Sequence, residues 1–180
     1  MKNTKITTQI KPPSDVKKKV ILSLTKRVLA DFIQTALKVE LSIHLGYAKH
    51  DQQSRKKVKN SGNYRNGYYK KKIHSSYGEV SVKVPRDEKG KFAPIVIPKH
   101  THDITEIEEK IIELYKGQKS VEEIKDVVCK IYSPDVSADI VINLAETLLL
   151  KFNQSKTKKL VKDFIIACTE CDNSDSENQK

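Results

Sequence analysis

The strongest constraint on how this chain can fold is a long helical pattern of apolar residues between about residues 14 and 45. Apolar side chains recur every three or four positions, which is the spacing of one helix face. One series is Ile21, Leu24, Val28, Phe32 and Ala36, and a second, adjacent series is Leu22, Leu29, Ile33, Leu37 and Leu41. A stripe this long and wide has to be covered, either by later helices of the same chain or by a second copy. We therefore predict an amphipathic helical segment over residues 14–47, with Gly46 as its stop, that serves core packing or self-association.

The apolar period changes to two after residue 70. In KKIHSSYGEVSVKVP, Val80, Val82 and Val84 alternate with polar residues, and the Ser-Ser-Tyr-Gly stretch before them is turn material. This predicts a β-hairpin of residues 71–74 against 79–84, with IVIP (95–98) as a short third strand. Sheets of this size are seldom stable alone, so within residues 48–99 we expect the hairpin to present the basic loop that precedes it.

Three short helices with clear start signals follow, over residues 103–152. Thr105 with Glu108, and Ser120 with Glu123, have the spacing of capping boxes, and a third helix should start after Ser137. The connection GQK (117–119) between the first two is short and contains glycine, as in a helix-turn-helix. We predict a three-helix bundle of helix-turn-helix type.

Both ends lack a strong pattern. Residues 1–13 are predicted to be a disordered tail. KTKKLVKDFII, within residues 153–180, could form a further helical turn or two before a polar, acidic and mostly disordered end. Only 37% of the residues are hydrophobic and there is no Trp, so some of the chain should lie outside any compact unit. The predicted fold class is α+β, mainly α.

Most of the chain's net positive charge lies in one short segment. The formal charge is +11, and residues 49–72 hold nine Lys or Arg against one acid, Asp51, which leaves only +3 for the rest. Concentrated positive charge points to a polyanionic partner, although a solvated, partner-free linker has the same charge. The interleaved glycine, asparagine and tyrosine favour DNA, because phosphate contacts use close backbone approach and short amide side chains as well as charge. The candidate DNA contacts are Arg55, Lys56, Lys57, Lys59, Asn63, Arg65, Asn66, Lys70, Lys71 and Lys72.

The third helix of the bundle is the other candidate DNA reader. In a helix-turn-helix its first turns enter the major groove, which selects Ser137 and Asn143. Its other polar residues are mainly acidic, with no Lys or Arg before Lys151, and an acidic face is a poor match to phosphates.

Other functions find little support in the residues. No phosphate-binding loop, nucleophile elbow or His-Glu-x-x-His pair occurs. Cys168 and Cys171 have metal-knuckle spacing but no second pair, so no metal site or cofactor is predicted. No apolar run is long enough to cross a membrane, and no targeting signal is visible. The three cysteines fit a reducing compartment, and we expect a cytoplasmic, nucleoid-associated protein.

Four sequence blocks resemble the N-terminal part of the mutator-type insertion-sequence transposases. They are HLGYAKHD (44–51), NSGNYRNGY (60–68), YGEVSVKVPRDEKGKFAP (77–94) and EEKIIELYKGQKSVEEI (108–124), in this order. The resemblance extends from about residue 29 to about residue 150. It implies binding of double-stranded DNA, the terminal inverted repeats of an element, through this N-terminal region.

The resemblance also implies a catalytic domain that these 180 residues do not match. Members of the family cut and join DNA with an Asp-Asp-Glu triad and two divalent metal ions on an RNase H-like fold. Because the chain after about residue 150 does not match a strand bearing the first catalytic Asp, we expect a truncated, DNA-binding fragment that is catalytically inactive alone. It could form a homodimer or pair with an intact transposase. Two alternatives stay open: a transposase completed by a catalytic half encoded downstream, and an inert pseudogene product.

Overall fold

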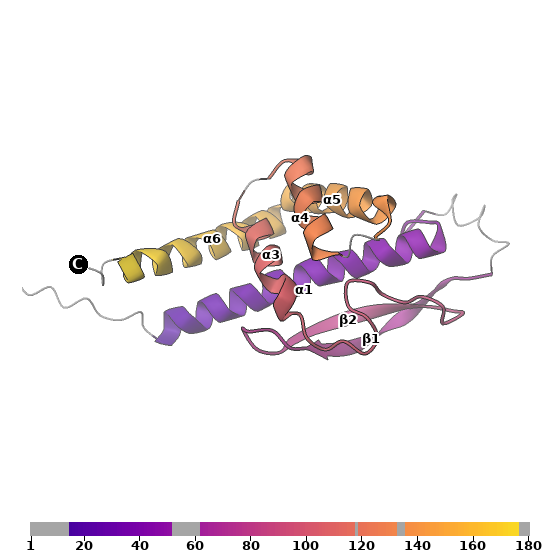
Figure 1. Ribbon diagram of the computed structural model, residues 1–180, viewed down its shortest axis with the longest axis horizontal. Helices are drawn as coiled ribbons and strands as arrows, with labels where there is room; N and C mark the ends of the chain where they lie inside the picture. Colours follow the sequence, from indigo (N-terminus) through magenta and orange to yellow (C-terminus); the bar gives the residue numbers. More distant parts are fainter. Residues whose placement is uncertain (1–14, 52–61, 118, 133–135, 177–180) are drawn as a thin grey trace, which may run out of the picture.

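Helix α1 (Asp15–Leu45) is the central layer of the structure. The structure is a computed structural model, and it describes residues 15–51, 62–117, 119–132 and 136–176. The side chains of residues 15–17, 155 and 170–176 are not among the described ones. The other elements are strands β1 (Arg65–Ile73) and β2 (Val80–Asp87) and helices α3 (Thr105–Tyr115), α4 (Val121–Ile131), α5 (Ala138–Phe152) and α6 (Ser155–Ser176). Figure 1 shows the hairpin on one side of α1 and the helices α3–α6 on the other, and among the described residues β2 packs on α1 as do α3, α5 and α6. The predicted mainly helical α+β fold is confirmed.

The wide apolar stripe of α1 is buried inside the chain itself. Val28, Leu29, Phe32, Ile33 and Ala36 have no exposed surface. Two adjacent apolar series are needed because one face of the helix meets the hairpin and the other meets the helical layer. Core packing, the first of the two predicted roles, therefore accounts for this part of the stripe.

Gly46 ends α1 as predicted. Its φ of 74° is the left-handed conformation that glycine adopts without a steric cost. The amide of Gly46 donates to the Ile43 carbonyl and that of Tyr47 to the Ser42 carbonyl. This pair of bonds is a Schellman cap, which satisfies carbonyls that the helix leaves unpaired.

The hairpin is longer than the sequence pattern predicted. Strand β1 begins at Arg65 rather than at residue 71, and β2 runs from Val80 to Asp87. The early part of β1 belongs to the predicted basic loop. The structure accommodates Asn66 and Gly67 there at an irregular register between Arg65 and Tyr68. Gly67 has a φ of 64° there, which is the role of glycine in a β-bulge.

The predicted third strand, residues 95–98, does not form. The buried carboxylate of Glu40, on α1, accepts hydrogen bonds from the amides of Ile95 and Val96 at 2.8 and 3.0 Å. The buried ammonium of Lys71 donates to the carbonyls of Pro98 and Lys99. Buried backbone groups need partners, and here two charged side chains take the place of a neighbouring strand.

The three predicted helices of the 103–152 region are confirmed, but only one of the two capping boxes is. Ser120 and Glu123 bond each other's backbone amides in a complete capping box at α4. At α3 the cap position is Ile104, with no side-chain cap. Glu108, the expected cap partner, is buried and accepts from the Ser76 amide in the hairpin turn instead. A tertiary contact has replaced the local one.

Helix α6 extends much further than the one or two turns predicted within 153–180. It continues to Ser176, while residues 177–180 lie outside the described part. Leu160 and Phe164 lie one turn apart and are buried, and α6 contacts α1, α3 and α5. Two apolar residues are a weak periodic signal in the sequence, and it is the packing surface offered by α1 that stabilises the helix. The predicted tail over residues 1–13 lies outside the described residues.

Candidate nucleic-acid interface

The side of the hairpin that faces away from α1 is polar and basic. Along β2, Val80, Val82 and Val84 are buried while Ser81 and Lys83 are exposed, as expected for a strand with one covered side. On β1 the same alternation exposes Lys70 and Lys72 and buries Lys71 and Ile73. We call Tyr68, Lys70, Lys72, Ser81 and Lys83 the hairpin outer face.

The strand register brings positive charges together on this outer face. Lys70 lies opposite Lys83, and Lys72 lies opposite Ser81. The Lys83 ammonium is 4.8 Å from the centre of the exposed Tyr68 ring, a cation–π contact. Lys72 is the member with an acidic partner, Glu79 at 2.8 Å, and both side chains of that pair are exposed. Like charges opposite each other destabilise a hairpin. The Lys70–Lys83 pair therefore does not stabilise the fold, but it is favourable for binding a polyanion.

Three of the predicted DNA contacts point into the protein instead. Lys71 is 5% exposed and holds the loop carbonyls described above. Arg65 donates to the Ser42 hydroxyl and the Tyr47 carbonyl, and packs over the Tyr47 ring. Asn63 donates to Asp87 and accepts from the amide of Lys89. These side chains anchor the hairpin, and none of them lies on the hairpin outer face.

Asp87 is the centre of the anchor at the open end of the hairpin. Burial disfavours the ionised form of Asp87 and would raise its pKa. Hydrogen bonds to the carboxylate outweigh burial and lower the pKa, and they come from the Phe92 amide, Asn63, His44 and the Lys91 amide. The end of β2 is thus tied to α1 through His44. Gln34 makes a second tie, because its side-chain amide bonds both the amide and the carbonyl of Lys83. These bonds tie the hairpin to α1, and among the described residues the side chains of its outer face are exposed.

The predicted reading residues on α5 lie in a different layer from the hairpin. Ser137 is the N-cap of α5 and accepts from the Asp139 amide. Asn143 is exposed and donates to the Asp139 carbonyl. The neighbouring exposed side chains include Ile142 and Glu146, and Lys151 is paired with Asp31 on α1. Since α1 separates α5 from the hairpin (Figure 1), one flat surface does not include both predicted sets.

The structure therefore brings together only part of the predicted site. Lys70 and Lys72 share the hairpin outer face, and Asn66 is exposed at the bulge. Arg55, Lys56, Lys57 and Lys59 lie outside the described residues. Lys83 was missed, although the alternation of VSVKVP already places it on the polar side of β2. What the pattern did not provide was the register, which sets Lys83 against Lys70.

The described part of the chain has neither a membrane-spanning helix nor a cluster of metal-binding side chains. Within it, no helix combines the length and the apolar character that crossing a bilayer requires. No group of three or more His, Cys, Asp or Glu side chains there could hold a metal ion. The Cys171 side chain, half of the Cys168–Cys171 pair, lies outside the described side chains.

Comparison with known proteins identifies relatives along nearly the whole chain. The family model "Transposase, Mutator family" matches residues 1–171. The transposase for insertion sequence element IS905 of Lactococcus lactis is 34% identical over 110 residues, which are 61% of this chain and 27% of that protein. The transposase for IS1201 of Lactobacillus helveticus is 29% identical over 144 residues, 80% of this chain and 38% of that protein. The transposase for IS256 in transposon Tn4001 of Staphylococcus aureus is 26% identical over 104 residues, 58% of this chain and 27% of that protein.

The extent of these matches decides the family. The chain spans about a quarter to two fifths of the length of these relatives. The family match also reaches beyond the 29–150 resemblance at both ends, and it includes most of α6. Because the family model covers residues 1–171 of 180, the chain belongs to the Mutator family of transposases.

Proposed function

We propose that this chain binds the DNA ends of an insertion sequence during transposition, and that the hairpin outer face is the surface that holds the duplex. The observation that carries the proposal is the cluster of Lys70, Lys72 and Lys83 on the exposed side of a hairpin whose other side is fixed to α1. The relatives are transposases by name, and a transposase has to hold its element's DNA.

The dimensions of the hairpin suit a duplex. A two-stranded antiparallel ribbon fits the major groove of B-DNA. Lys70 and Lys72, two residues apart on one strand, stand about 7 Å from each other. Lys83 on the opposite strand widens the positive strip. Lysines with this spacing can contact successive phosphates while Tyr68 lies among them, with a ring and a hydroxyl available for the DNA.

The terminal inverted repeats of the element are the proposed target, and sequence reading is a separate property from affinity. Lysine–phosphate contacts position a protein without reading the sequence. Specificity would need base contacts, for which Asn66 on the hairpin and Asn143 on α5 remain candidates. Binding to the element would associate the chain with the nucleoid. We assign the cutting and joining steps to none of the described residues.

Pairing with a second copy or with an intact transposase also stays a prediction. The middle of α1 is not the surface for it, since residues such as Val28, Phe32 and Leu37 are fully buried within the chain.

The decisive experiment is a salt titration of binding to two duplexes, one with the terminal inverted repeat of the encoding element and one with its sequence scrambled. We expect a steep fall in affinity with salt, since each phosphate contact contributes about 0.9 to the slope of log K against log salt concentration. Replacing Lys70, Lys72 and Lys83 together by Ala should flatten that slope by about 2 to 3.

The matched control is Lys130→Ala, which removes one exposed lysine from α4, on the far side of α1. It should leave the slope unchanged. Absence of binding to either duplex at low salt would refute the proposed function. Binding with an unchanged slope in the triple variant would place the DNA on another surface.

A further inference from the structure

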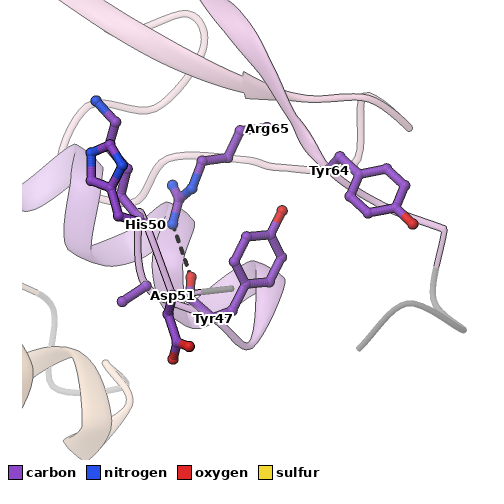
Figure 2. Close-up of a pocket in the computed structure, with 7 residues that line it drawn as sticks. Tyr47, His50, Asp51, Tyr64 and Arg65 are labelled. Atoms are coloured by element: carbon purple, nitrogen blue, oxygen red, sulfur yellow. Dashed lines mark hydrogen bonds between the residues drawn. The ribbon is translucent and has the colours of Figure 1, made fainter. Parts of the chain in front are cut away.

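The end of α1 and the start of β1 enclose a small pocket next to the open end of the hairpin. Its volume is about 270 Å³, and it is lined by Tyr47, Ala48, Lys49, His50, Asp51, Tyr64 and Arg65. This is just below the about 300–1,000 Å³ typical of small-molecule sites, so the pocket can take a single phosphate with part of its sugar. Figure 2 shows the Arg65 guanidinium next to Tyr47, with Tyr64 further from it than Tyr47 is.

Arg65 carries a positive charge that its protein partners do not neutralise. Its Nη2 donates to a hydroxyl and to a carbonyl, of Ser42 at 3.0 Å and of Tyr47 at 2.9 Å, and its guanidinium lies 5.4 Å from the centre of the Tyr47 ring. All three partners are uncharged. The Nε–H of Arg65 is buried and has no hydrogen-bond partner among the described residues, and such an unpaired donor is costly. An acceptor that enters the pocket would repay that cost.

The pocket's other charged groups also favour an anion. Lys49 and His50 are exposed at the rim. Asp51 is the one carboxylate in the lining, and in Figure 2 it points away from the Arg65 guanidinium. Lys49 and Arg65 against Asp51 give the lining a net positive charge.

The backbone of the pocket is held in an unusual conformation at His50. Its φ is 73°, and among the described residues it is the one non-glycine with a positive φ. Strained backbone of this kind concentrates at ligand-binding positions. The Schellman cap occupies the Ser42 and Ile43 carbonyls at the negative end of α1, which reduces their repulsion of an anion.

From this geometry we infer that the pocket binds one phosphate of the DNA backbone, with Arg65 Nε–H as the buried donor and Lys49 at the rim. Both Nη2 hydrogens already bond Ser42 and Tyr47, so the Nε–H can give one bond to a phosphate oxygen. A hydrogen bond between an ionised donor and an ionised acceptor is stronger than one between neutral groups. The inference rests on the proposed function, because the phosphate belongs to the duplex that the hairpin outer face holds. The pocket would then fix where along the DNA the hairpin lies, as an anchor beside the open end of β1 and β2.

The first test is direct observation of the Arg65 Nε–H by proton–nitrogen NMR. The chain has only four arginines, Arg27, Arg55, Arg65 and Arg86, so the signal can be assigned by its loss in Arg65→Lys. We expect it to shift downfield when a mixed-sequence duplex is added at low salt, because the unpaired donor gains an acceptor. A matching shift with inorganic phosphate alone would show that the pocket also binds free phosphate through the Arg65 Nε–H. A shift with inorganic phosphate but not with the duplex would overturn the inference.

The second test is the salt slope of Lys49→Ala against Lys130→Ala on the same duplex. Lys49 is exposed, so its loss should leave the fold intact and lower the slope by about 0.9, one phosphate contact. Lys130→Ala should not change it.

The results separate this inference from the proposed function. If the triple lysine variant of the hairpin flattens the slope while Lys49→Ala does not and the Arg65 signal stays in place, the hairpin binds DNA and the pocket does not. If the wild-type chain binds no duplex at low salt, the proposed function fails and the pocket inference fails with it.

Discussion

At the scale of single residues, neighbouring lysines in one sequence run have opposite roles. Lys70, Lys71 and Lys72 are identical in type and adjacent, yet Lys71 is buried and bonded to two carbonyls while the other two face solvent. Burial lowers the pKa of Lys71. The difference follows from the period of two of a strand, since successive side chains point to opposite sides of the sheet.

Lys71→Ala should destabilise the fold by about 1–3 kcal/mol, because two loop carbonyls would lose a charged donor in a buried place. Lys70→Ala should change the free energy of unfolding by less than about 0.5 kcal/mol and instead weaken DNA binding. Urea denaturation and a DNA titration of both variants measure the two effects. Equal stability of the two variants would contradict the assignment of Lys71 to the interior.

Asp87 makes the stability of the fold depend on pH in the acid range. Its folded-state pKa is lowered from the usual value of 3.8, so the stabilisation from its ionised form is present above that value. The stabilisation is lost as pH falls through and below it. Asp87→Asn should lower stability at neutral pH and remove this part of the acid dependence.

Urea denaturation of the wild type and Asp87→Asn at a series of pH values between neutral and acid measures this dependence. Asp126→Asn, at an exposed position on α4, is the control and should keep the wild-type slope. An identical pH dependence in Asp87→Asn and the wild type would show that the hydrogen bonds to Asp87 do not lower its pKa.

At the scale of elements, the start signals in the sequence predicted all three helices of the 103–152 region, but only one of the two predicted capping boxes forms. The capping box of Ser120 and Glu123 is local, so the pattern alone predicted it correctly. The similar pattern of Thr105 and Glu108 failed because Glu108 bonds the Ser76 amide from the hairpin turn, a partner 32 residues away. A local motif is reliable only where no tertiary contact competes for its side chains.

Replacing the two cap candidates distinguishes them. Ser120→Ala should cost about 0.5–2 kcal/mol of stability, the usual loss for a true N-cap. Thr105→Ala should cost less than about 0.5 kcal/mol, since the Thr105 hydroxyl bonds the exposed Asp103 carboxylate and does not cap α3. Thermal or urea unfolding of both variants is the measurement, and a larger loss for Thr105→Ala would restore the predicted cap.

At the scale of the whole molecule, α1 connects two layers that would be unstable alone. A two-stranded hairpin and a set of short helices both lack sufficient core of their own, and each covers one side of α1. Polar contacts link α1 to the helical layer as well. Asp31 accepts from the Tyr115 hydroxyl of α3 and pairs with Lys151 of α5, and burial together with the Asp31 charge raises the pKa of Tyr115.

Phe164→Ala tests whether α6 is part of this unit. Phe164 is 1% exposed, so its truncation should cost about 3–5 kcal/mol and shift a single cooperative unfolding transition. Ile166→Ala, on the same helix but 45% exposed, should cost less than about 0.5 kcal/mol. Equal, small effects in urea denaturation would mean that α6 is not docked on α1.

The sequence by itself determined the elements whose signals are local and strong. The 31-residue α1, its stop at Gly46, the valine alternation of β2 and the start of α4 all follow from periodicity and capping over a few residues. The motif blocks were enough for the transposase family, and the charge count was enough to direct attention to residues 49–72.

Only the tertiary structure decided which of the predicted contact residues lie on the hairpin outer face. The side of the hairpin that α1 covers determines that Lys71, Arg65 and Asn63 turn inward, and the register determines that Lys83 joins Lys70. The absent third strand and the long α6 were also decided by distant partners, Glu40 in one case and the surface of α1 in the other. The reason is physical: burial and hydrogen bonding depend on groups far away in sequence, and a local pattern contains no record of them.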